Sequence, residues 1–350
     1  MKKIIFLLAT ILILSGAVAL GFGIRYISGD EAFESATTGN SGLEIDGLNL
    51  RLLEISHENI LKQASFTAIN TYSGRITKYA APFDSETNLE IKRRTNEKAL
   101  GQIRIDIVSS AVSLYNSELA FADANTAYDR AIEEYNEAKS DSSLSSIEVL
   151  SLEYTAKSKR IAMTLTENNL ESSRRKLAML LGEENVSVDI PMVYSDPYSL
   201  DFEKVYEKAL ETDIGIYRAK RESESASMKF EIAKLFFDED DTTYVGSLAG
   251  LRNAELAYDN ALLSLEASVL DGIESLMNKY DSIELEKLNN LIKLEAFNSA
   301  GEQYDAGILS KVSYDASQAA YNAAQRQLAS KIYDYIIASM KFELDTGYEF

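Results

Sequence analysis

The chain has 350 residues, of which 46% are hydrophobic, with three prolines, no cysteine and no tryptophan. So few prolines favour long uninterrupted helices over several compact domains, because proline ends or kinks a helix. The formal net charge of −20 argues against nucleic acid as a partner, and the lack of cysteine excludes disulfides and thiol chemistry.

The N-terminus combines Lys2 and Lys3 with an apolar run over residues 4–24. At about 1.5 Å per residue, the run is long enough to cross a bilayer as a helix. It also fits a signal peptide, with Ala17-Val18-Ala19 as the cleavage site. We favour an uncleaved membrane anchor, because the hydrophobicity continues past that site. In both cases the body is exported to the cell envelope. Residues 25–46, rich in Gly, Ser, Thr and acids, are predicted to be a flexible linker.

Two halves of the chain align after a shift of 165 residues. The shift places Leu144-Ser145-Ser146-Ile147 on Leu309-Ser310-Lys311-Val312, and Gly182 on Gly347. An ungapped match of both the turn and the terminal glycine indicates a tandem duplication. The predicted domains are a signal peptide or anchor over 1–24, a linker over 25–46, a first repeat over 47–182, an inter-repeat linker over 183–197 and a second repeat over 198–347.

Each repeat contains a long outgoing helix with an apolar residue at every seventh position, the spacing of a coiled-coil seam. The seam positions of the first repeat are Ile107, Leu114, Phe121, Tyr128 and Tyr135. Those of the second are Leu262, Val269, Leu276, Ile283, Phe297 and Tyr304, interrupted by the polar Asn290. We expect Asn290 to fix the register of the helices.

A returning helix follows each outgoing helix. It carries Tyr314, Tyr321, Leu328, Tyr335 and Phe342 in the second repeat, and Ile147, Tyr154, Ile161 and the polar Asn168 in the first. Ser or Asp residues in the breaks at 140–146 and 306–310 are expected to cap these helices, and Gly182 and Gly347 to end them in the left-handed conformation.

The predicted fold is therefore all-α: two tandem repeats of long antiparallel coiled-coil helical hairpins, with little or no β structure. One hairpin of this length cannot bury every apolar stripe, so we expect it to pack on neighbours.

The second hairpin resembles the TolC-type outer membrane efflux family. The likeness rests on Tyr304-Asp305-Ala306-Gly307-Ile308-Leu309-Ser310, followed by Tyr314, Ala316, Ala320 and residues 328–347. These match the family's pattern of an aromatic residue, a glycine, an aliphatic-Ser turn and an Ala-, Gln- and Leu-rich returning helix. Residues 199–212 and, more weakly, Leu48-Asn49-Leu50 are similar to the starts of the family's repeats. The likeness covers about residues 47–347.

The resemblance implies a homotrimer whose helices form a tunnel, working with a periplasmic-type adaptor and an inner-membrane or ABC-type transporter. It also implies that the hairpin turns, residues 141–147 and 307–312, dock on the adaptor. The candidate contact residues are Ser143, Leu144, Ser145, Ile147, Gly307, Ile308, Leu309, Ser310 and Val312. The alternative is that these residues only cap helices.

The sequence departs from the family where family members have barrel strands in the outer membrane. A membrane strand needs about 9 to 11 residues of alternating polarity. The connections at residues 78–88 and 238–248 are each too short for a pair of such strands. We therefore expect a divergent member that lacks the membrane β-barrel and is held by its N-terminal segment, with the outer membrane as the location if it follows the family.

The chain is poor in histidine and cysteine, two residue types that form metal or nucleophile sites. His57 is its single histidine, and without cysteine there is no second residue of these types to complete a metal or nucleophile site. The acidic run at residues 238–241 lacks the spaced ligands of a calcium loop, so we expect a solvated turn. We predict no cofactor and no enzymatic activity. Besides an efflux component, a structural coiled-coil envelope protein without transport activity remains an alternative.

Overall fold

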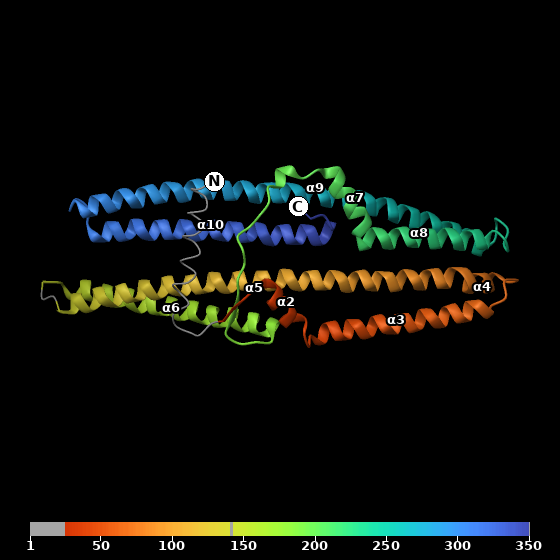
Figure 1. The fold of residues 1–350 in the computed structure, drawn as a ribbon, viewed down its shortest axis with the longest axis horizontal. Helices are drawn as coiled ribbons and strands as arrows, with labels where there is room; N and C mark the ends of the chain where they lie inside the picture. The colour runs from red at the N-terminus through yellow and green to blue at the C-terminus, as the bar shows by residue number, and fades with distance from the viewer. Residues whose placement is uncertain (1–24, 141–142, 350) are drawn as a thin grey trace. The chain divides into compact units, whose positions relative to one another are not determined.

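The computed structural model describes residues 25–140 and 143–349 (Figure 1). These residues divide into two compact units. The first unit contains residues 25–38, 103–140, 143–192 and 290–333, and the second contains 39–102, 193–289 and 334–349. Each unit thus combines segments of both predicted repeats.

Helices make up most of the described chain, which confirms the all-α prediction. In chain order the elements are β1 (Arg25–Ile27), α2 (Gly29–Thr37), α3 (Ser41–Phe66), α4 (Tyr72–Arg75), a π-helix (Ile76–Ala80), α5 (Ala81–Ser140), α6 (Ser146–Leu181), β2 (Val186–Val188), a 3₁₀ helix (Pro197–Ser199), α7 (Phe202–Thr212), α8 (Ile214–Ala233), α9 (Thr242–Asp305) and α10 (Lys311–Thr346).

The core of the first unit lies where α2, α5 and α6 meet a two-stranded sheet. Strands β1 and β2 pair in parallel, with Arg25 opposite Val186 and Ile27 opposite Val188. Ile27 and both valines are buried in one cluster with residues of the three helices. These helix residues are Ala32, Ala36, Ile107, Ala111, Leu114, Leu170, Leu177 and Leu181.

The second unit has its core along α9 and the end of α10. Tyr335 is fully buried, and its ring makes edge contacts with Tyr194 and Tyr280, at centroid distances of 5.6 and 6.0 Å. Its hydroxyl donates a hydrogen bond to the carbonyl oxygen of Ser195 at 2.9 Å. The chain between the predicted repeats is thereby fixed to two helices of this unit.

Close helix packing in the second unit depends on a glycine of α9. A Cβ atom added at Gly272 would lie 2.8 Å from the ring of Phe342, closer than such contacts occur in proteins. Glycine therefore lets α9 and α10 approach each other here.

The predicted flexible linker over residues 25–46 is wrong. Its residues form β1, α2 and the start of α3. Ser28 caps α2, where its side chain accepts from the Glu31 N–H, and Asn40 caps α3, where its side chain accepts from the N–H groups of Gly42 and Leu43. These caps satisfy free amides of the first turns, so a composition typical of linkers here marks helix starts.

The two connections expected at residues 78–88 and 238–248 are also displaced. Residues 78–88 lie in the π-helix and the start of α5, and the non-helical connection is residues 67–71. In the second repeat α9 already begins at Thr242, whose neighbour Asp241 accepts a hydrogen bond from the Thr243 N–H at 2.6 Å.

The shift of 165 residues carries the bounds of α6 onto those of α10 and the end of α5 onto the end of α9. Gly182 and Gly347 have φ angles of 72° and 68°, which confirms the expected left-handed ends. Both returning helices thus have the same length and the same closing geometry. The duplication itself stays a prediction.

No helix within residues 25–140 and 143–349 is long and apolar enough to cross a membrane. The predicted anchor or signal peptide over 1–24 lies outside the described residues.

Candidate functional site

The first hairpin turn presents a capped helix end and one exposed aliphatic side chain. Asp141 and Ser142 lie outside the described residues. Ser145 and Glu148 form a reciprocal capping box: the Glu148 N–H donates to Ser145 Oγ at 3.3 Å, and the Ser145 N–H donates to Glu148 Oε2 at 2.8 Å. The hydrogen bonds from the Ser145 hydroxyl and N–H lower the pKa of Glu148.

Around this box the candidate contact residues differ in exposure. Ser143 and Ser145 are exposed, Leu144 is half-buried, and Ile147 is 77% exposed. Ser145 caps α6, as expected from the sequence. The side chain of Ile147 is exposed and available to a partner.

The second hairpin turn follows the same plan. Gly307 has a φ angle of 72°, a conformation that favours glycine. The N–H groups of Ile308 and Leu309 both donate to the carbonyl oxygen of Gln303, and Ser310 Oγ accepts from the Ser313 N–H at 3.3 Å. Leu309 is half-buried, whereas Ile308 and Val312 are 77% and 79% exposed.

The two turns lie at the same end of the first unit (Figure 1). Each turn combines a serine-capped helix start with exposed aliphatic side chains. This arrangement can dock a protein surface, because apolar side chains exposed at a rigid turn gain free energy when a partner covers them.

The predicted seam residues lie in the helical hairpins with graded burial. Buried positions are Ile107, Leu114, Val269, Leu276, Ile283, Leu328, Tyr335 and Phe342. Half-buried positions are Phe121, Tyr128, Tyr135, Leu262, Phe297, Tyr314 and Tyr321. Tyr304 is 39% exposed, but its ring stacks on Tyr314 with the centroids 5.1 Å apart. Near the second turn, stacked aromatic rings thus take the place of aliphatic packing.

Asn290 is the polar residue in the second seam. It is only 2% exposed, and its Nδ2 atom has no hydrogen-bond partner among the described residues. A buried donor without a partner loses its hydrogen bonds to water and gains none in return.

A second set of apolar residues faces away from the chain. On α6 the stripe consists of Ile147, Leu150, Tyr154, Ile161 and Leu165, which are 61 to 77% exposed. The seven-spaced residues of the first returning helix therefore do not pack inside their own hairpin. The buried positions of α6 are instead Ala156, Leu170, Ser173, Leu177 and Leu181.

Two more exposed stripes lie on α9 and α3. That of α9 consists of Leu285, Leu288, Leu291 and Ile292, and that of α3 of Ile45, Leu48, Leu52 and Ile55. Sequence reasoning missed both, although their spacings of three and four residues are those of a helix face.

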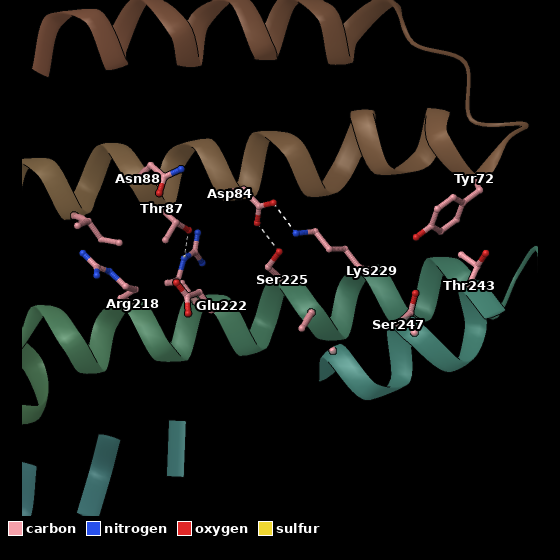
Figure 2. A pocket seen from close by; sticks show the side chains of 15 residues that line it. Tyr72, Asp84, Thr87, Asn88, Arg218, Glu222, Ser225, Lys229, Thr243 and Ser247 are labelled. Atoms are coloured by element: carbon pink, nitrogen blue, oxygen red, sulfur yellow. Dashed lines mark hydrogen bonds and ion pairs between the residues drawn. The ribbon is translucent and has the colours of Figure 1, made fainter. Parts of the chain in front are cut away.

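A groove in the second unit, with a volume of about 800 Å³, is lined mainly by α5, α8 and the start of α9 (Figure 2). Lys229 on α8 forms an ion pair with Asp84 on α5, with Nζ and Oδ2 2.8 Å apart. The Ser225 hydroxyl donates to the other oxygen of Asp84. These residues were not singled out from the sequence, because their partners are more than 130 positions away.

One turn along, Arg221 makes a second set of contacts with α5. Its Nε donates to Thr87 Oγ1 at 3.1 Å, it pairs with Glu86 at 3.1 Å, and its guanidinium lies 3.6 Å from the centre of the Phe83 ring. The charged groups at this wall of the groove are thus used to join α5 and α8.

His57 lies near a hydroxyl, with its Nδ1 atom 3.1 Å from Ser85 Oγ. This pair joins α3 to α5. A Ser-His nucleophile also needs a third group to orient the ring, and no carboxylate is hydrogen-bonded to His57 in the part of the chain that the structure describes. Over those same residues no group of three His, Asp or Glu side chains is placed to hold a metal ion.

No protein-family model matches the sequence, and no curated protein matches it. Solved structures do match. The CmeC outer membrane channel of Campylobacter jejuni has a TM-score of 0.64 at 12% identity, covering 92% of this chain and 86% of that chain. The outer membrane protein VceC of Vibrio cholerae has a TM-score of 0.63 at 13% identity, covering 92% and 97%. The MtrE outer membrane channel of Neisseria gonorrhoeae has a TM-score of 0.59 at 13% identity, covering 91% and 88%.

At these identities the likeness concerns the fold. It extends over nearly the whole chain, and the fold is that of the TolC-type channels that the second hairpin resembles in sequence.

Proposed function

We propose that this chain is an export component of the cell envelope: a TolC-like helical conduit that works with a membrane transporter and an adaptor. The observation that carries the proposal is the shared fold with outer membrane channels over more than nine-tenths of the chain. The proposed mechanism is passive. The chain supplies a wall of helices, and the transporter supplies energy and selects the substrate.

The exposed stripes support an assembly of several chains. Large apolar residues on α3, α6 and α9 face away from their own chain, and such contiguous patches are rare on monomeric soluble proteins. A closed trimer would cover these stripes with sister chains. The acidic character of the chain, with a net charge of −20, would give such a conduit a field that favours cations.

The hairpin turns are the proposed adaptor contacts, through Ile147, Ile308 and Val312. We also propose that the N-terminal segment holds the assembly at a membrane, as its two lysines and long apolar run predict.

The assembly is tested by light scattering on the full chain in mild detergent. We expect three times the mass of one chain. A stable monomer or dimer would remove the tunnel from the proposal.

Transport is tested separately, with the double variant Ile308→Asp, Val312→Asp. We expect this variant to assemble like the parent chain but to lose export of the transporter's substrate and cross-linking to the adaptor, because charged side chains cannot replace the exposed aliphatic ones in an apolar contact. A trimer that exports nothing with any neighbouring transporter would instead support the structural envelope protein.

A further inference from the structure

Two helix connections of the second unit contact each other at one of its ends (Figure 1). The connection from α3 to α4 lies within residues 66–75, and the connection from α8 to α9 lies within residues 234–245. We call these two segments together the double turn. Aromatic side chains join them, because Tyr72 meets the rings of Phe236 and Phe237 edge to face, at centroid distances of 6.4 and 5.1 Å.

Polar contacts fix the backbone of the double turn. Arg75 Nε donates to the carbonyl oxygen of Ile69 at 3.1 Å, and its guanidinium lies 5.6 Å from the centre of the Phe236 ring. Thr71 caps α4, where its side chain accepts from the Gly74 N–H at 3.0 Å. A surface that is already ordered loses little conformational entropy when a partner binds to it.

Large apolar side chains stand exposed on this ordered base. Phe66 is 89% exposed, Leu235 62%, Val245 53% and Ile69 40%. No large apolar side chain in residues 25–140 and 143–349 is more exposed than that of Phe66. Single exposed apolar residues are ordinary on a protein surface, whereas several on one ordered turn indicate a surface that a partner covers.

The free charge of the double turn is negative. Its two basic side chains already have partners, since Arg75 lies over an aromatic ring and Lys234 pairs with Glu231 at 2.9 Å. The acids at residues 238–240 are exposed and form no ion pair among the residues that the structure describes. Exposed apolar side chains thus lie beside carboxylates whose charge is not compensated.

We propose that the double turn docks a partner protein whose surface carries basic side chains around an apolar patch. The patch covers Phe66 and Leu235, and the basic side chains meet the acids at residues 238–240. Opposite charges around an apolar contact orient the two proteins and speed their association. These residues are not those of the hairpin turns, so the inference goes beyond the proposed adaptor contacts.

The same charges argue against two other occupants of the double turn. A second copy docked through the same turns would place its acids at residues 238–240 against those of the first, and like charges repel. A bilayer could take up Phe66 only by drawing those carboxylates towards the lipid, where an unpaired charge is costly, and anionic headgroups would repel them.

The absence of cysteine from the chain allows a test that reports on one position at a time. The full chain carries Asn70→Cys, an exposed position of the double turn, or Asn298→Cys, an exposed position of α9 between the acids Glu295 and Glu302. The probe is a helical peptide with leucine on one face, lysine on the other and one terminal cysteine. A matched peptide has glutamate in place of lysine. Disulfide formation under mild oxidation is followed on non-reducing gels, because it requires close approach of the two cysteines.

We expect the lysine peptide to react about tenfold faster at Asn70→Cys than at Asn298→Cys, and the glutamate peptide to show no such preference. Adding Phe66→Ser and Leu235→Ser to the Asn70→Cys chain should slow the reaction about tenfold. The matched control adds Met179→Ser and Val193→Ser, which remove side chains that are 85% and 79% exposed, and should leave the rate unchanged.

A further variant neutralises the acids with Asp238→Asn, Glu239→Gln and Asp240→Asn. It should remove the advantage of the lysine peptide over the glutamate peptide at Asn70→Cys, because that advantage comes from their charge.

Other results would overturn the proposal. Equal rates at Asn70→Cys and Asn298→Cys would mean that the lysine peptide only follows the acidity of the chain. An unchanged rate after Phe66→Ser and Leu235→Ser would remove the apolar contact. A fluorophore on Asn70→Cys that lipid-bound quenchers reach, with the full chain in phosphatidylcholine vesicles, would assign the double turn to a bilayer instead.

Discussion

Replacing Asn290 by leucine should stabilise the chain. The amide is 2% exposed, its Nδ2 atom has no partner among the described residues, and it stands between Ile283 and Phe297 in a seam of apolar residues. Leaving a buried donor unsatisfied costs about 1–3 kcal/mol, so Asn290→Leu should raise the free energy of unfolding by about that amount. Leucine has the same number of side-chain heavy atoms and the same branch point as asparagine, so it can add apolar contacts at this position.

The measurement is urea unfolding followed by circular dichroism, at one fixed protein concentration. The matched control is Asn289→Leu, because the Asn289 amide is half-buried and donates to Glu286 Oε2 at 3.0 Å. That variant should not gain stability. A loss of stability in Asn290→Leu would refute the reasoning, since it would mean that the amide makes a favourable interaction.

Three further predictions concern titration, glycines and a helix cap. Burial raises the pKa of Tyr335 to about 12 from 10.0, so the contribution of its neutral hydroxyl to stability is complete below pH 10, and up to about 3 kcal/mol of it is lost as the pH rises through 12. Urea unfolding of Tyr335→Phe should show a shallower alkaline loss, and an equal loss would contradict the assignment. Gly272→Ala should destabilise by about 1–3 kcal/mol, because its Cβ would meet Phe342, whereas Gly250→Ala, with nothing within 4 Å, should stabilise by up to about 1 kcal/mol; thermal unfolding that ranked them the other way would refute the packing. Ser145→Ala should cost about 1 kcal/mol through the lost cap, read from urea unfolding, with no change expected if α6 is capped by other groups.

The hairpins could be predicted from the sequence because their signals are local. Each signal can be recognised from residues that are close in the sequence: the spacing by seven, the serine at each turn and the glycine at each end. Ser145, Ser310, Gly182 and Gly347 all have the expected cap or left-handed geometry.

The sequence predicts a connection over residues 78–88, a stretch that contains Pro82, yet these residues are helical. In the structure, Pro82 lies directly after the π-helix, in the first turn of α5. A proline has no N–H to donate, and a π-turn changes the local hydrogen-bonding pattern, so the helix continues through this position.

Which stripe of α6 faces inward could not be predicted from spacing alone. Ile161 and Leu170 both belong to seven-spaced series, and only the packing decides that Leu170 is buried while Ile161 is exposed. The groove in the second unit was missed for a similar reason, because Asp84 and Lys229 are 145 positions apart in the sequence. Spacing along one helix carries no information about such pairs.

The short parallel pair of β1 and β2 determines which part of the fold would first bear a pulling force applied ahead of Arg25. Arg25 is held by its N–H to the carbonyl oxygen of Asn185 at 3.0 Å, and the Asp189 N–H donates to the Ile27 carbonyl oxygen at 2.9 Å. Asn185 and Asp189 lie in the chain between the predicted repeats, residues 183–197. A pull on residues ahead of Arg25 would therefore reach the junction of the repeats before it reached any long helix, and the parallel strands would share the load in shear.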